Sequence, residues 1–240
     1  MLTGANPACQ VLTWHSGCQA GTIGYMRAHA FANGEFYHVF NRGVDKRNIF
    51  LEKDDFARFL LGMEVFNTVE PIGSIYEHSF LKKDALGSRD AKSRLVDIVC
   101  YCLNPNHYHF TLEQLVDDGV SSYMGRLSGG FAQYFNRKYK RSGALFESRY
   151  KSTHVVSNEQ LLHTSAYVNL NDRVHGLRRG ASVSSWHEYL ADSPGGLCKK
   201  DVILKQFKNV AEYRDFAESS FVDMQGRKQS SKELRQMLLE

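Results

Sequence analysis

Residues 95–115 read LVDIVCYCLNPNHYHFTLEQL, with two apolar runs on either side of the turn sequence Asn104-Pro105-Asn106. Asn and Pro favour tight turns, and runs rich in β-branched and aromatic residues favour strands, so this stretch predicts an antiparallel hairpin with strands over 95–103 and 107–115. Successive side chains of a strand point to opposite faces of its sheet. His107 and His109 therefore lie on one face, and the aromatic residues that alternate with them lie on the other.

The segments around the hairpin predict an α+β fold of the ferredoxin-like type, βαββαβ. Strand-like alternation and the three- and four-residue steps of amphipathic helices follow one another in this order, and an extra helix comes at the end. Such a fold has an antiparallel sheet with its third strand in the centre and helices on one face. The expected elements are a strand over 35–42, a helix from Asp54-Asp55, the two hairpin strands, a helix over 120–139, a strand over 144–156 and a helix over 157–171.

The composition is that of an ordinary globular protein, with 42% hydrophobic and 23% charged residues. No apolar run approaches the roughly 20 residues that span a bilayer. Residues 1–25 contain no Lys or Arg and no continuous apolar segment, so they lack the features of a secretory signal. The five cysteines form no C-x-x-C pair, which argues against a zinc knuckle and a disulfide framework. These features predict a cytoplasmic protein without a membrane partner.

Positive charge is concentrated between Ser121 and Val156, although the whole chain has a formal net charge of only +4. Glu147 is the single acidic residue of this segment. Such a concentration is expected where a polyanion binds, although a basic helix face is more often simply solvated. Tyr134, Tyr139 and Tyr150 lie among the cations and could stack on unpaired bases or pack under the cations. The candidate DNA-binding residues are Arg126, Arg137, Lys138, Lys140, Arg141, Arg149 and Lys151.

Two imidazoles on one strand face form half of a metal site, but they are also compatible with a pair of core or hydrogen-bonded histidines. In the last expected helix of the fold, His163, Tyr167 and Asn171 are spaced four apart and so share one side. That side could equally hold a half-exposed Tyr beside an Asn that caps the helix. If it faces His107 and His109, a phenol and a third oxygen ligand join the metal site. This set suits phosphodiester cleavage, because the metal would stabilise charge at phosphorus while the Tyr oxygen attacks.

These motifs resemble those of a known family, the single-tyrosine HUH transposases, which include the insertion-sequence-200-like group and the REP-associated tyrosine transposases of bacteria. HUH denotes His, a bulky hydrophobic residue and His, here His107-Tyr108-His109. The blocks YHVFNRG, LNPNHYHF, AQYFNRKYKRSGALFESRYKS and YVNLN occur in the family's order between about Met26 and Leu177. The sequence departs from the family at Asp172, where relatives usually have Pro, and in the long connection over 68–94.

The resemblance implies that Tyr167 is the catalytic nucleophile and that His107, His109 and Asn171 are ligands of Mg²⁺ or Mn²⁺. It further implies a DNA transposase that binds hairpin-bearing single-stranded DNA, and cleaves and rejoins it through a 5′-phosphotyrosine. Whether the chain acts as a monomer or a homodimer stays open.

The resemblance also implies the domain boundaries. Relatives begin near the position of Met26, so residues 1–25 are expected to be an extension outside the catalytic domain. The catalytic domain is expected over residues 26–180. Residues 181–240 are expected to form a small helical C-terminal extension with short helices, such as one over 201–216, and a frayed charged tail.

Two other functions are compatible with the sequence. One is a DNA-hairpin-binding protein of the same ancestry that has lost the ability to cleave. The presence of all four site residues argues against this function. The other is a zinc metallohydrolase. For that reaction Glu113, on the same strand face as His107 and His109, is the candidate acidic ligand or general base, but the basic, Tyr-rich segment would have no role.

Overall fold

The computed structural model describes residues 30–73, 75, 94–191 and 195–237. The expected extension over 1–25 and most of the expected connection over 68–94 lie outside the described residues. Residues from Phe31 onward belong to one compact unit. Within the described ranges, no helix combines the length and the apolar character needed to cross a bilayer.

A five-stranded antiparallel sheet forms the centre of this unit, with the strand order β4-β1-β3-β2-β5. The first four strands in that order have the ferredoxin-like arrangement, which confirms the predicted fold class, and β3 is the central strand. The fourth strand is shorter than expected because the chain over 144–150 leaves the ladder, with only an isolated bridge between Gly43 and Phe146. The strands are β1 (Phe36–Arg42), β2 (Val96–Asn104), β3 (His107–Gln114), β4 (Lys151–Val155) and β5 (Val183–Ser184).

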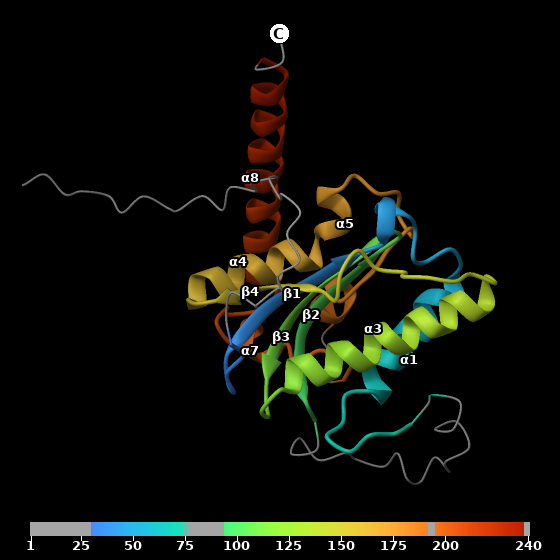
Figure 1. Ribbon diagram of the computed structural model, residues 1–240. Helices are drawn as coiled ribbons and strands as arrows, with labels where there is room; N and C mark the ends of the chain where they lie inside the picture. Colours follow the sequence, from blue (N-terminus) through green and yellow to red (C-terminus); the bar gives the residue numbers. More distant parts are fainter. Residues whose placement is uncertain (1–29, 74, 76–93, 192–194, 238–240) are drawn as a thin grey trace, which may run out of the picture. The chain divides into compact units, whose positions relative to one another are not determined.

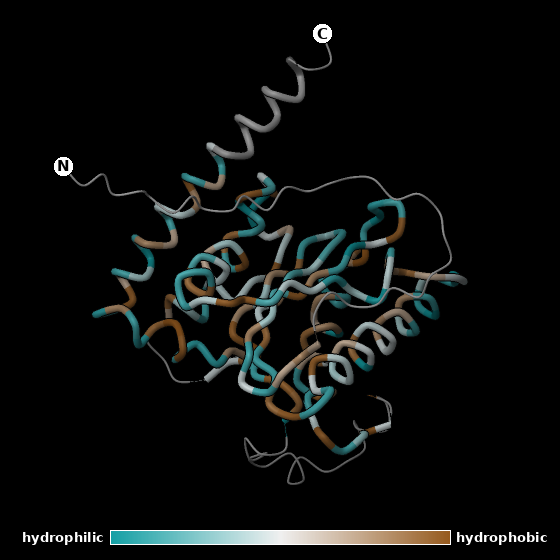
Figure 2. Tube along the Cα trace, turned by 60° about the vertical axis from the view of Figure 1, so that its left-hand side comes forward, coloured by the Kyte–Doolittle hydropathy of each residue, from teal (hydrophilic) through white to brown (hydrophobic). Residues whose placement is uncertain are grey.

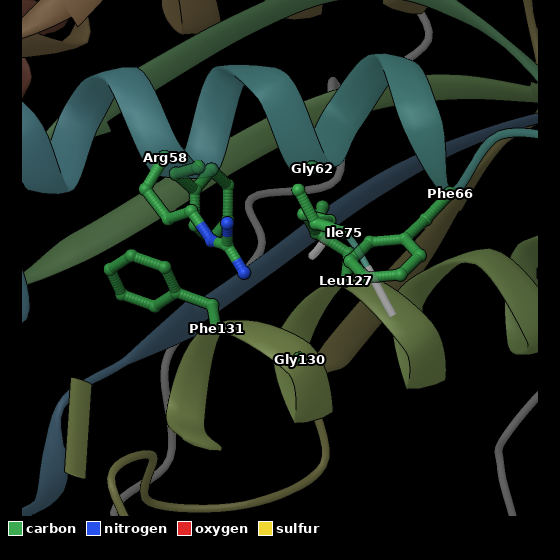
Figure 3. A pocket seen from close by; sticks show the side chains of 8 residues that line it. Arg58, Gly62, Phe66, Ile75, Leu127, Gly130 and Phe131 are labelled. Carbon is green, nitrogen blue, oxygen red and sulfur yellow. The ribbon is translucent and has the colours of Figure 1, made fainter. Parts of the chain in front are cut away.

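Two helices, α1 (Lys53–Val65) and α3 (Gly119–Lys138), cover one face of the sheet (Figure 1). The side chains of β3 that alternate with the histidines, Tyr108 and Phe110, are fully buried on this face. The two helices approach closely where glycines face the partner helix, as Figure 3 shows beside Phe66 and Leu127. A Cβ atom on Gly130 would lie 2.9 Å from the Phe66 ring, so the contact requires glycine.

The opposite face is covered by α4 (Asn158–Asn169) together with residues that follow it (Figure 1). Ser157 caps α4 by accepting a hydrogen bond from the Gln160 backbone N–H, as the capping-box spacing predicts, and Gln160 Oε1 accepts one from Val156 N. Leu170 follows the last residue of α4, and a further helical turn begins directly after it at Asn171. The elements after α4 are α5 (Asn171–Val174), α6 (Trp186–Leu190), α7 (Asp201–Leu204) and α8 (Val210–Met237).

The region over 181–240 is helical, as expected, but it belongs to the same compact unit as the sheet. β5 pairs with β2, and α8 packs on α4 with Tyr213, Ala217 and Ser220 on its buried side. Hydrophilic and hydrophobic residues alternate along this part of α8 (Figure 2). The expected helix over 201–216 is instead two helices. Asn209 caps the second one by accepting from Glu212 N, and α8 then continues as helix where a frayed tail was expected.

Candidate active site

The histidine pair lies on the face of the sheet that α4 covers. The rings of His107 and His109 have their centroids 5.2 Å apart and are nearly perpendicular. His109 is buried, and His107 is half-buried. Because residues paired directly across strands share a face, the neighbours of the pair on β1 are Phe40, opposite His109, and Arg42, opposite His107. The predicted common face of the two imidazoles is confirmed.

Tyr167 lies on the side of α4 that faces these imidazoles. Its ring packs edge-on against His109, with centroids 5.5 Å apart, and against His38 of β1 at 5.8 Å. Burial raises the pKa of the Tyr167 phenol, and a hydrogen-bond interaction with the Asn171 side chain partly offsets this effect. The phenol is therefore neutral at pH 7 and must lose its proton during any nucleophilic attack.

Asn171 is the first residue of α5 and is fully buried against the end of β2. Its Oδ1 accepts a hydrogen bond from Asn104 Nδ2 at 2.7 Å and lies 3.2 Å from His107 Nε2. The same Asn104 nitrogen lies 2.9 Å from His107 Nε2. The end of α4 at Leu170 thus places the amide oxygen of Asn171 next to the His107 imidazole. The four-residue spacing between Tyr167 and Asn171 suggested this placement.

Asn106 determines which nitrogen of His107 carries the proton. The Asn106 amide donates from Nδ2 to the carbonyl of Lys46, so its Oδ1 is turned toward His107 Nδ1, 2.6 Å away. His107 Nδ1 is then the donor, and Nε2 keeps its lone pair. Burial, assisted by the neighbouring His175, lowers the pKa of His107 to about 4, so the ring is neutral at pH 7. Burial also lowers the pKa of His109 well below its usual range.

These residues fit a divalent cation. A neutral imidazole nitrogen and an amide oxygen, both electron-pair donors, lie 3.2 Å apart with a second imidazole beside them, and such atoms bind divalent metals. No group of three or more His, Cys, Asp or Glu side chains among the residues the structure describes could hold a metal. The candidate third ligand is the amide oxygen of Asn171, 3.2 Å from His107 Nε2. Glu113 lies four residues along β3 from His109, which is about 13 Å in a strand, so the geometry does not support the zinc hydrolase.

His163 is the exception to the predicted polar stripe, because it points to α8 and away from the histidine pair. Its Nδ1 lies 3.2 Å from Ser220 Oγ, and its ring packs 5.1 Å from the Phe216 ring. The reason is that α4 is covered on two sides. Tyr167 and Asn171 lie toward the sheet, whereas the first turns of α4 also meet the C-terminal helix, which the sequence did not predict there.

Three of the seven candidate DNA-binding residues are held within the protein. Lys138 forms ion pairs with Asp55 and Glu52 at 2.9 and 3.1 Å. Arg126 donates to the carbonyl groups of Thr68 and Val69 at the end of α1. Arg141 donates to the Asn136 side chain and the Ala144 carbonyl. Lys138 also lies over the rings of Tyr134 and Tyr139, which donate to Asp55, so these two tyrosines pack under the cation.

The other four cations, Arg137, Lys140, Arg149 and Lys151, are exposed and form no ion pair with another residue in the described part of the chain. Lys151 is paired with Phe40, which in turn is paired with His109, so Lys151 lies on the face of the histidine pair. Two strand spacings separate it from His109, or about 10 Å. Lys151 therefore provides an exposed cation near the candidate site.

Sequence reasoning missed four residues around the site, one of which is His175, whose ring centroid lies 4.8 Å from that of His107. Asn104 and Asn106 contact His107, and His38 contacts His109 with its Nε2 2.9 Å from His109 Nδ1. The two asparagines belong to the turn sequence and were assigned only to the turn. His38 shares the predicted first strand with Phe40, but its meeting with His109 depends on the register between β1 and β3, which the sequence does not give.

An imidazole pair, an amide oxygen and a phenol come together on one face of the ferredoxin-like sheet and define the candidate active site. Residues 84–171 match the family model described as "Transposase IS200 like", which confirms the resemblance that the motifs carry. This range contains the histidine pair, Tyr167 and Asn171. One similar solved structure is "Structure of the REP associates tyrosine transposase bound to a REP hairpin", with a TM-score of 0.49 and 14% identity over 73% of this chain and 90% of that one. No curated protein matches the chain.

Proposed function

We propose that the protein is a DNA transposase that cleaves and rejoins hairpin-bearing single-stranded DNA, with Tyr167 as its nucleophile. The observation that carries the proposal is the contact between the Tyr167 ring and His109, at 5.5 Å between centroids, beside the cluster of His107 and Asn171. Tyr167 is only partly buried, and a phenol that merely packed there would not need two neutral imidazoles and an amide oxygen next to it.

The chemistry follows from these groups. The Tyr167 oxygen forms a bond to phosphorus, the bond from phosphorus to the 3′ oxygen of the cleaved strand breaks, and the proton of the phenol ends on that 3′ oxygen. The 5′-phosphotyrosine keeps the phosphodiester energy, so a 3′ hydroxyl can later reverse the reaction and join strands. Mg²⁺ or Mn²⁺, held by His107, His109 and Asn171, would supply Lewis-acid stabilisation of the negative charge at phosphorus.

The DNA surface of this proposal is smaller than the whole basic segment. Arg137, Lys140, Arg149 and Lys151 are exposed and can neutralise phosphates, whereas Lys138, Arg126 and Arg141 support the fold. A hairpin as the structured part of the substrate is what the family resemblance implies.

The test is incubation with hairpin-bearing single-stranded DNA and Mn²⁺, followed by denaturing electrophoresis. Wild-type protein should form a covalent adduct, and Tyr167→Phe should not. Tyr150→Phe is the matched control and should keep the adduct. His107→Ala should lose the adduct while it still binds DNA, because the exposed cations are unchanged. An adduct that persists in Tyr167→Phe would overturn the assignment of the nucleophile.

A further inference from the structure

His38 and His109 meet through ring nitrogens. His38 Nε2 lies 2.9 Å from His109 Nδ1, and the two ring planes are inclined by only 14°. A hydrogen bond at this distance contains one proton, which one nitrogen donates and the other accepts. The position of that proton decides the state of the second nitrogen of His109, because a neutral imidazole carries a proton on only one nitrogen.

The other histidine of the pair has the same arrangement with a different partner. His107 donates from its Nδ1 to Asn106 Oδ1, so its Nε2 carries the electron pair, which lies 2.9 Å from Asn104 Nδ2. His109 likewise uses its Nδ1, here toward His38. Both rings therefore direct the same nitrogen, Nδ1, to a partner within the sheet and its turn. In this arrangement, Nε2 of each ring is the nitrogen without a proton and could bind a cation.

We propose that His38 is a positioning residue that accepts the Nδ1 proton of His109 and so holds His109 in the tautomer whose Nε2 can bind the metal. The metal-binding purpose of this role rests on the proposed function, whereas the contact between His38 and His109 is observed independently of it. Partners that hold the far nitrogen of a metal-binding histidine fix both its tautomer and the orientation of its ring. His38 thus does for His109 what Asn106 does for His107.

Packing alone does not account for His38. Phe40, two residues further along β1 on the same face, already stacks on His109, with centroids 5.6 Å apart and ring planes inclined by 21°. An apolar ring would fill the position of His38 equally well. What the imidazole adds is an acceptor nitrogen in the plane of the His109 ring.

The test compares two substitutions of His38 with a matched control. His38→Gln keeps an acceptor near the position of Nε2, and His38→Leu removes it. Phe40→Leu removes the other ring that packs on His109 but leaves the hydrogen bond. Long-range ¹H–¹⁵N NMR of the metal-free, DNA-free protein reads the tautomer directly, and calorimetric titration with Mn²⁺ reads the affinity. Thermal melting verifies that each variant is folded.

In wild type, His38→Gln and Phe40→Leu, we expect His109 to carry its proton on Nδ1. In His38→Leu we expect a mixture of tautomers and a 10- to 100-fold loss of Mn²⁺ affinity, which His38→Gln restores. A His109 proton on Nε2 in the wild type, or an unchanged tautomer in His38→Leu, would overturn the proposal. The NMR result does not depend on DNA cleavage. If wild-type protein forms no adduct with DNA, the transposase function is refuted, but the NMR spectra still decide the tautomer of His109.

Discussion

Lys138 and Arg137 are adjacent cations in the basic segment, but the structure gives them different roles. Lys138 donates to Asp55, whose carboxylate is fully buried, and lies over two tyrosine rings. Arg137 is exposed and has no ion-pair partner in the described part of the chain. We therefore predict that Lys138→Ala destabilises the fold and that Arg137→Ala weakens DNA binding.

The size of the stability effect follows from what Asp55 loses. Its carboxylate also accepts hydrogen bonds from the backbone N–H groups of Leu51 and Glu52 and from two tyrosine hydroxyls, so it remains partly satisfied. Asp55 loses one charge-assisted hydrogen bond, worth about 1.5–3 kcal/mol. The second ion pair of Lys138, with Glu52, adds little because the Glu52 side chain is 59% exposed. The Lys138 side chain is 25% exposed, and we expect the lower end of this range because water competes for it. Arg137→Ala should change the free energy of unfolding by less than about 0.5 kcal/mol.

Urea denaturation measures the first effect, and fluorescence anisotropy with hairpin-bearing single-stranded DNA at several salt concentrations measures the second. Removing one phosphate contact should lower the slope of log affinity against log salt by about 0.7–0.9, and Arg137→Ala should show this change. Lys138→Ala should keep the wild-type slope under conditions where it is folded. The reasoning is refuted if Lys138→Ala unfolds like wild type and also reduces the salt dependence.

Three further predictions concern stability. Burial raises the pKa of Asp55, but hydrogen bonds led by that of Lys138 outweigh burial and leave the pKa below its ordinary value. The stability that Asp55 adds over Asp55→Asn should therefore hold at neutral pH and shrink as pH falls below about 4, in urea titrations at pH 7 and pH 3. Gly130→Ala should lower the free energy of unfolding by about 1–3 kcal/mol because its Cβ would meet the Phe66 ring. Gly129→Ala, whose Cβ would have no atom within 4 Å, should raise it by up to about 1 kcal/mol. Equal shifts of the melting temperature in the two variants would contradict this prediction. Tyr213→Phe should lower the free energy of unfolding by about 1–3 kcal/mol, because the buried Asn169 amide loses its acceptor. An unchanged melting temperature would show that this hydrogen bond does not stabilise the fold.

The central hairpin could be predicted because its signals are local. The turn residues and the alternation over 95–115 determine the two strands and the common face of His107 and His109, and the sheet confirms both. The spacing between Tyr167 and Asn171 is local in the same sense. The boundaries of α1, α3 and α4 were also nearly right, since capping by residues such as Ser157 acts within one turn.

The environment of the site could not be predicted because it depends on pairing across strands. His38, Arg42 and Lys151 reach the histidine face only through the registers of β1 with β3 and of β1 with β4. The roles of the cations in the basic segment could not be predicted for the same reason. Charge is visible in the sequence, but whether a cation meets a buried carboxylate, as Lys138 meets Asp55, depends on how α1 packs on α3.

The C-terminal region has a direct consequence for the candidate site, because it contacts the helices that carry Tyr167 and Asn171, α4 and α5. Asn169, between them in the chain, donates to Tyr213 of α8 and accepts from Ser185 next to β5.

Arg173, two residues after Asn171, forms a bidentate ion pair with Glu218 of α8, with N···O distances of 2.6 and 2.8 Å. In a helix, residues two apart point to nearly opposite sides, so the contacts with α8 restrain α4 and α5 from behind while Tyr167 and Asn171 face the sheet. Ser185 and α8 therefore position Tyr167, the nucleophile of the proposed function, and α8 also packs Tyr213 and Ala217 against α4. An exchange of DNA strands at Tyr167 would have to accommodate this restraint.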